Sequence, residues 1–191
     1  MTKRIAFIGA AGSGKSTLAA EVFVELKKLG KNVELITEWV RSDIHLHGPL
    51  QTIWEQLRTQ LHQRMREDAV PTSAEYMLTD SGTLTPYFYA CLYVDNTDSR
   101  QRLVLQDMYK FFLDDLYLHR YSHIFFLPSL QTYAANPNML HDGTRFQTMN
   151  EIEILEQHMA LMFTKLHKLD NVHVLDCELS NRAANILKII S

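Results

Sequence analysis

Short apolar runs alternate along the chain with longer stretches whose apolar residues recur every three or four positions. Runs that are apolar on both faces are typical of strands buried in a parallel sheet. Five short, largely apolar runs lie at residues 5–8, 33–36, 76–79, 124–127 and 172–175, and the first of them is apolar on both faces. Strands that alternate with helices predict an α/β domain, in which right-handed crossovers place helices on both faces of a five-stranded parallel sheet.

The stretches between the apolar runs have helical periodicity. In the first of them Leu18, Val22, Leu26 and Leu29 share one stripe, and Gly30 follows as a stop. Thr148 and Glu151 have the spacing of a capping box, and Ser180 is expected to cap the last helix. Helices are therefore predicted over residues 16–29, 50–69, 85–94, 98–118, 148–169 and from 180 onward.

The stretch from Ser129 to Phe146 contains proline, asparagine and glycine and has no clear period. Long loops of this kind in compact domains are often functional lids. We therefore expect a single three-layer domain over residues 1–191, with a lid at about 129–146.

Composition excludes several classes of protein. A net charge of −3 over 191 residues provides no global basic field that would draw the chain to nucleic acid or anionic lipid. The two cysteines form neither a disulfide framework nor a zinc pattern. There is no secretory signal and no apolar run of about 20 residues, so we expect a cytoplasmic protein without a membrane partner, in the host cytoplasm if it is phage-encoded.

The most specific motif follows the first apolar run and precedes the first helix. Its pattern, Gly-x-x-x-x-Gly-Lys-Ser, is that of a phosphate-binding loop between a strand and a helix. The glycines let backbone N–H groups approach phosphate oxygens at a helix N-terminus. We expect the nucleotide to be bound by Gly9, Ala10, Ala11, Gly12, Ser13, Gly14, Lys15, Ser16 and Thr17.

Two side chains of this loop have separate expected roles. Lys15 places a positive charge at the β- and γ-phosphates, and the Ser16 hydroxyl is a hard ligand for Mg²⁺. The Asn-Lys-x-Asp motif with which GTPases read their base is absent, and little chain remains after the third strand for the extra elements of a ring ATPase. These absences favour a small kinase.

The acceptor side is predicted from residues that follow the second and third strands, where ligands bind in such sheets. Asp80 could hold Mg²⁺ together with Ser16, or it could cap a turn. Glu38 suits the role of a base for a substrate hydroxyl, and Arg41 that of a cation for the γ-phosphate oxygens. A surface Glu–Arg pair is the alternative reading of the latter two. On the lid, Arg145 could supply a transition-state cation while water is excluded, or could simply be solvated.

Three further groups are expected to be mainly structural. Asp43, His45 and His47 are interpreted as solvated loop residues. The basic stretch with Arg58, His62, Arg64 and Arg66 is interpreted as a solvated helix face. The aromatic residues Tyr87, Phe88, Tyr89 and Tyr93 are interpreted as core, although one ring could stack on the acceptor.

The ordered set of motifs resembles the AAA-type P-loop kinases, which include the nicotinamide-riboside kinase domain of bacterial NAD regulators and related phage nucleotide kinases. The matching residues are 9–17, Glu38 to Arg41, Asp80 and Asp142 to Arg145. The resemblance implies ATP as donor, Mg²⁺ as cofactor, Glu38 near the acceptor hydroxyl and Arg145 in the lid. Many relatives have Asp-Arg where this chain has Asp80-Ser81, which favours a neutral nucleoside over a monophosphate as the acceptor.

Three functions therefore stay open. The first is an ATP-dependent kinase for a hydroxyl of a nucleoside or nucleotide-like acceptor. The second is a phage kinase acting on hydroxymethyl-pyrimidine bases in DNA, motivated by the basic stretch from Arg58 to Arg66 and opposed by the net charge. The third is a nucleotide-dependent switch whose loop presents a surface to a partner.

Overall fold

A computed structural model describes residues 1–128 and 146–191. Its five strands form one parallel sheet, as predicted, and their order is β2-β3-β1-β4-β5. The strands are β1 (Lys3–Ile8), β2 (Val33–Ile36), β3 (Tyr76–Asp80), β4 (His123–Phe126) and β5 (Val172–Val174). Each lies within two residues of the apolar run that predicted it.

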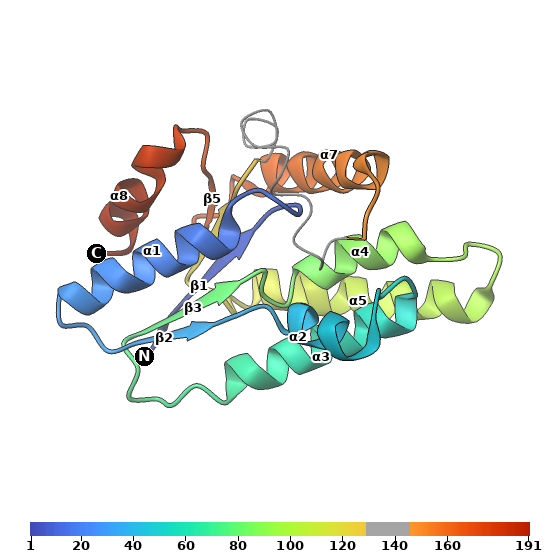
Figure 1. Ribbon diagram of the computed structural model, residues 1–191, viewed down its shortest axis with the longest axis horizontal. Coiled ribbons are helices and arrows are strands. Elements are labelled where there is room, and N and C mark those ends of the chain that lie inside the picture. Colours follow the sequence, from blue (N-terminus) through green and yellow to red (C-terminus); the bar gives the residue numbers. More distant parts are fainter. Residues whose placement is uncertain (129–145) are drawn as a thin grey trace.

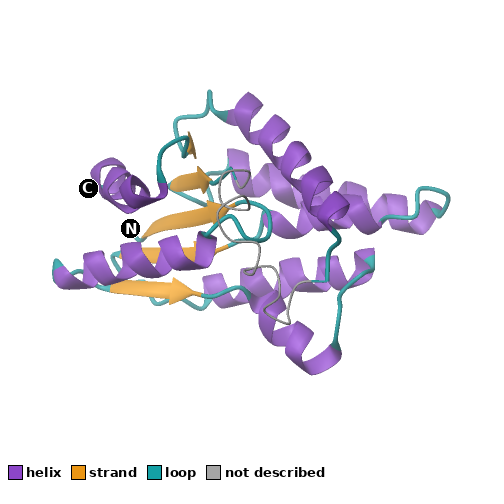
Figure 2. Ribbon diagram, turned by 45° about the horizontal axis from the view of Figure 1, so that its top comes forward, coloured by secondary structure: helices purple, strands orange, loops and turns teal. Residues whose placement is uncertain are grey.

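Helices cover both faces of this sheet, so the three-layer architecture is confirmed (Figures 1 and 2). The described helices are α1 (Lys15–Lys28), α2 (Trp39–His47), α3 (Ile53–Asp68), α4 (Thr85–Tyr93), α5 (Ser99–Tyr117), α7 (Met149–Leu166) and α8 (Leu179–Ile190). Within the described ranges, no helix is long and apolar enough to span a membrane.

The core has two parts, one on each side of the sheet. Along β1, Ile5 and Phe7 face α1 and α8, whereas Ala6 and Ile8 face α4, α5 and α7. All four side chains have no exposed surface, which explains why residues 5–8 are apolar at every position. Beyond this core, α2 packs against α3, and α3 packs against α4.

Capping explains where two of the helices begin. Thr148 and Glu151 form the predicted capping box at the start of α7, and Thr52 and Glu55 form a second one at the start of α3. The prediction that Ser180 caps the last helix is wrong, because α8 begins after Glu178 without a side-chain cap.

A helix follows β2 where the sequence suggested a loop. Asp43, His45 and His47 all lie on α2, and Asp43 is buried rather than solvated. The burial is explained by two partners, since Asp43 accepts from Arg58 at 2.5 Å and contacts the ring nitrogen of His47 at 2.8 Å.

The sheet order brings the functional segments together. The three neighbouring strands β2, β3 and β1 are parallel, so their carboxyl ends meet at one edge of the sheet, with Phe7 in register with Asp80 and Ile36 with Thr79. The phosphate-binding loop after β1, the Glu38 segment after β2 and Asp80 at the end of β3 therefore surround one region.

Candidate active site

The loop between β1 and α1 has the backbone of an anion-binding nest. Gly12 and Gly14 have φ values of 81° and 86°, in the left-handed region that favours glycine. Gly14 is also the N-cap of α1, and no side chain caps the helix there. The first N–H groups of α1 are therefore free of a side-chain cap, which is the arrangement that binds phosphate.

The loop is packed tightly onto the end of β4. A Cβ on Gly9 would lie 2.6 Å from Ser13 Oγ and 2.7 Å from the Leu127 carbonyl oxygen, so only glycine fits there. On the other side, Arg182 of α8 donates to the Ser13 carbonyl at 3.3 Å and to the Pro128 carbonyl at 3.4 Å. The loop is thus held from the sheet and from the last helix.

Lys15 is largely buried, and its Nζ donates to the Ala10 carbonyl oxygen at 2.9 Å within the loop. Beside it, Ser16 Oγ donates to Asp80 Oδ2 at 2.5 Å. The other oxygen of the same carboxylate, Asp80 Oδ1, is buried and has no hydrogen-bond partner among the described residues. The structure therefore brings together the two oxygen donors that the sequence suggested for Mg²⁺.

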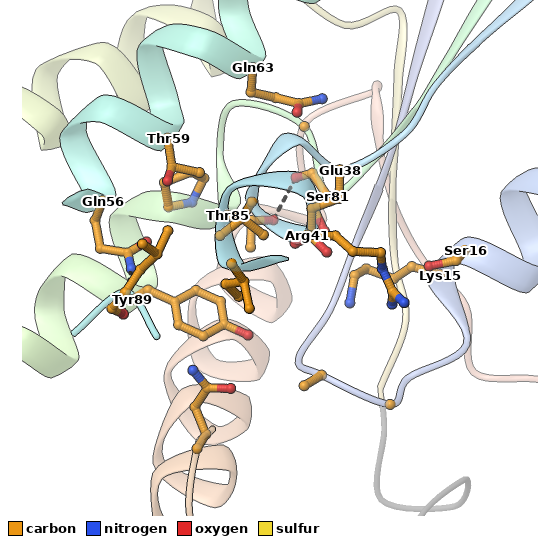
Figure 3. Close-up of a pocket in the computed structure, with 18 of the residues that line it drawn as sticks. Lys15, Ser16, Glu38, Arg41, Gln56, Thr59, Gln63, Ser81, Thr85 and Tyr89 are labelled. Carbon is orange, nitrogen blue, oxygen red and sulfur yellow. Dashed lines mark hydrogen bonds between the residues drawn. The ribbon is translucent and has the colours of Figure 1, made fainter. Parts of the chain in front are cut away.

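Glu38 lies at the end of the segment after β2, as the N-cap residue of α2. Its Oε1 accepts from Ser81 Oγ at 3.0 Å (Figure 3). Burial, followed by the negative charge of Asp80, raises the pKa of Glu38 above the usual glutamate value, against the opposing effects of Lys15, Ser81 and Arg41. A carboxylate with a raised pKa at the mouth of an anion site is suited to accept a proton from a substrate hydroxyl.

Ser81 is thus a contact of Glu38 that the sequence did not reveal. Its φ of 71° is unusual for a residue other than glycine and follows from the sharp turn between Asp80 and Gly82. The turn aims the Ser81 hydroxyl at Glu38, while the Ser81 carbonyl accepts from Thr85 Oγ1 at 2.5 Å.

Ser81→Ala is expected to shift the pH profile of catalysis. The Ser81 hydrogen bond favours ionised Glu38 and so lowers its pKa. Without this bond the pKa of Glu38 rises further, and the acid limb of a kcat/KM profile should move to higher pH. Steady-state rates between pH 5 and pH 8 measure the limb; an unmoved limb would mean that Glu38 is not the titrating group.

A cavity of about 250 Å³ connects the phosphate loop with the helices after β2 and β3 (Figure 3). Its charged lining residues, Lys15, Glu38 and Arg41, gather at the loop end. The far end is lined by uncharged residues from α3, α4 and neighbouring segments. Among these are Leu50, Gln56, Thr59, Pro86, Tyr89 and Gln147.

Several of these lining residues were not predicted from the sequence. Thr59 is 5% exposed, and its Oγ1 has no hydrogen-bond partner in the described part of the chain. Gln56 donates to the Leu50 carbonyl at 3.3 Å. The aromatic residues of α4 differ in their surroundings. Tyr89 lines the cavity, whereas Phe88 is buried in the core against Phe112 and Phe163.

The predicted cation Arg41 is exposed and lines the cavity near Glu38. Arg145 and the rest of the stretch 129–145 lie outside the described residues, so the predicted lid and its arginine stay predictions. Phe146 and Gln147, which follow this stretch, do line the cavity.

The comparisons with known proteins agree with this geometry. The model of one family, the AAA domain, matches residues 4–174. None of the curated proteins compared with the chain gives a significant match.

Three of the solved structures that are similar to this chain are the NadR protein in complex with NR, a deoxyadenosine kinase and a thymidylate kinase. The NadR protein in complex with NR has a TM-score of 0.72 at 17% identity, over 99% of this chain and 50% of that one. Deoxyadenosine kinase from M. mycoides with bound dATP has a TM-score of 0.60 at 20% identity, over 98% of each chain. Thymidylate kinase from Candida albicans has a TM-score of 0.68 at 14% identity, over 99% of this chain and 91% of that one. This chain spans half the length of the NadR chain, and at these identities the similarity shows a shared fold.

Proposed function

Because the chain belongs to the AAA domain family and shares its fold with P-loop kinases, we propose that it is a kinase. It transfers the γ-phosphate of ATP to a hydroxyl of a nucleoside or a nucleoside-like alcohol. The observation that carries this proposal is the single cavity that runs from the phosphate loop past Glu38 to an uncharged polar end. A donor and an acceptor can both be held in such a cavity, with the carboxylate between them.

The residues present fit ATP and Mg²⁺. Gly12 and Gly14 give the loop the conformation of a phosphate nest, and Lys15 adds the charge. Ser16 Oγ and Asp80 Oδ2 lie side by side, and Asp80 Oδ1 lacks a partner among the described residues, as expected for oxygens that hold a hard cation. When bound, Mg²⁺ offsets the negative charge of the phosphates during transfer.

Glu38 is proposed as the base of the reaction. The acceptor oxygen forms a bond to the γ-phosphorus as Glu38 takes the hydroxyl proton, and the bond to the β–γ bridging oxygen breaks to release ADP. Lys15 and Arg41 offset the charge on the transferred oxygens. Arg145 is proposed to add a further cation from the segment 129–145.

The acceptor is proposed to be uncharged. The far end of the cavity has no charged side chain among the described residues. Ser81 also stands where many of the kinases that the chain resembles have an arginine. The unpartnered Thr59 hydroxyl, the Gln56 side chain and the Tyr89 ring instead offer hydrogen bonds and an aromatic surface. These groups suit the base and sugar of a nucleoside.

No observation favours the other two functions. The basic stretch that motivated a DNA substrate is largely paired, since Arg58 contacts Asp43 and Arg64 contacts Asp115, each at 2.5 Å. A regulatory switch would need a partner surface on the segment 129–146, most of which lies outside the described residues.

The test is ADP release from ATP-Mg²⁺ with a panel of acceptors. Nucleosides, nucleoside monophosphates, nicotinamide riboside and hydroxymethyl-pyrimidine DNA are each compared with a blank that lacks acceptor. We expect one uncharged nucleoside-like compound to raise the rate well above the blank and its monophosphate to be inactive. Equal rates with and without acceptor would refute the proposal.

A further inference from the structure

The basic face of α3, which the proposed reaction does not use, is turned toward the segment that carries Glu38. Arg66 donates to the Thr37 carbonyl at 3.0 Å and to Thr37 Oγ1 at 3.2 Å. The His62 ring stacks on the Trp39 ring, with centroids 4.4 Å apart and an angle of 8° between the planes. The Arg58 guanidinium lies 5.8 Å from the centre of the same indole. Residues on both sides of Glu38 are therefore held by α3.

A buried amide completes these contacts. Gln63, which is 2% exposed, accepts a hydrogen bond from the Trp39 backbone N–H at 3.0 Å through Oε1. Through Nε2 it donates to Thr79 Oγ1 at 2.9 Å. Thr79 in turn donates to the buried carboxylate of Glu67 at 3.0 Å.

Glu67, at one end of this chain of hydrogen bonds, determines which group donates and which accepts in each bond. Glu67 also accepts from the Tyr121 hydroxyl and from Arg120, so the carboxylate is held in place. The Thr79 proton is committed to Glu67, and Thr79 Oγ1 must accept from Gln63. The Gln63 amide then presents its oxygen, and only its oxygen, to the Trp39 N–H.

The Trp39 N–H lies directly after Glu38 in the chain, so the contact with Gln63 affects how Glu38 is held. Trp39 is the first residue of α2, and the N–H groups of a first helical turn have no partner within the helix. Glu38 is the N-cap but makes no side-chain cap, because its carboxylate is turned to Ser81 instead. Gln63 supplies a partner from α3 for the Trp39 N–H and so fixes the backbone directly after Glu38, from which the Glu38 side chain departs toward Ser81.

We infer that Gln63 is a positioning residue, which keeps the Glu38 carboxylate directed into the cavity by fixing the backbone beside it through the Trp39 N–H. Arg66 donates hydrogen bonds to Thr37, the residue before Glu38. His62 and Arg58 contact the ring of Trp39, the residue after it. The inference about catalysis rests on the proposed function, whereas the contacts between α3 and the Glu38 segment are observed independently of it.

The matched pair of variants is Gln63→Met and Gln60→Met. Both glutamines are 2% exposed, lie on α3 and donate one buried hydrogen bond, but Gln60 donates to the Thr83 carbonyl and is not a cavity-lining residue. Methionine keeps the length of the side chain and removes its hydrogen bonds. We expect Gln63→Met to lower kcat by up to about 100-fold, with KM for ATP changed less than about twofold, because a small misplacement of a reacting group is costly. Gln60→Met should leave kcat nearly unchanged, and an equal loss in both variants would overturn the inference.

A readout that needs no activity separates this inference from the proposed function. The chain has two tryptophans, so Trp54→Phe leaves Trp39 as the one fluorophore of its kind. In that background Gln63→Met should increase acrylamide quenching of Trp39, and Gln60→Met should not. If no acceptor supports turnover, the proposed function fails while quenching still tests the contacts. Unchanged quenching in Gln63→Met, or changed quenching with full kcat, would overturn the positioning role.

A second variant is available if Gln63→Met does not fold. Arg66→Gln changes a partly exposed residue and removes the charged donor to Thr37. It should lower kcat in the same direction by a smaller factor, again with KM for ATP preserved, and Arg66→Lys should restore part of it. A full kcat in Arg66→Gln would count against a role of α3 in holding Glu38.

Discussion

Lys15→Ala is expected to lower kcat/KM by about 100- to 1000-fold, which is the usual cost of losing one charged donor from a site that stabilises developing charge. Lys15 is largely buried in the phosphate loop, and its Nζ contacts the Ala10 carbonyl at 2.9 Å. No other cation in the described loop residues 9–17 can replace it. ADP release at saturating acceptor measures the loss.

The control for this variant is Lys28→Ala. Lys28 lies on the same helix, its side chain is 66% exposed and it pairs with Glu25, so its removal changes the net charge equally without touching the loop. Circular dichroism and Tm should show both variants folded. If Lys15→Ala keeps the wild-type rate, phosphate transfer does not take place at this loop.

Glu38→Gln is expected to lower kcat by about 100- to 10,000-fold, the range for loss of a general base, while KM for ATP changes less than about twofold. Glutamine keeps the shape of the side chain and can still accept the hydrogen bond from Ser81. What it loses is the ability to take a proton.

The pH profile distinguishes a base from a structural carboxylate. The pKa of Glu38 is raised by burial and by Asp80, so activity should fall as the pH falls through a value above that of an ordinary glutamate. Glu38→Gln should lack this acid limb, and Glu34→Gln on β2, outside the cavity lining, should retain it together with the full rate. An acid limb that persists in Glu38→Gln would assign the base to another group.

The strands and the phosphate loop could be predicted because their physical requirements are local. A stretch of strand that is buried on both faces is expected to be apolar throughout, as residues 5–8 of β1 and 76–78 of β3 are. The contact between Ser16 and Asp80 also followed from position, since Ser16 lies in the first turn of the helix after β1 and Asp80 ends the neighbouring strand β3.

Residues whose environment depends on distant partners were harder to predict. Asp43 looks like a loop carboxylate until Arg58, fifteen residues later, pairs with it. The inner side of α3 did carry a signal, because Gln56, Gln60, Gln63 and Glu67 recur at helical spacing and are all buried. A polar stripe on the inner side of a helix indicates a cavity or a buried network, and here it provides both.

The strand order has a consequence for how the chain is made. β1 precedes the other four strands of the sheet in the chain, yet it lies in the middle of the sheet, and its two neighbours end only at residues 80 and 126. Until then an apolar strand with two unpaired edges is exposed to other nascent chains, which is the condition for misassembly. Pairing of strands over such sequence separations is also slow, because the chain loses the entropy of loop closure before the stabilising contacts form. The nucleotide loop at residues 9–17 therefore takes its final shape only once β4 has paired with β1 and the Leu127 carbonyl lies against Gly9.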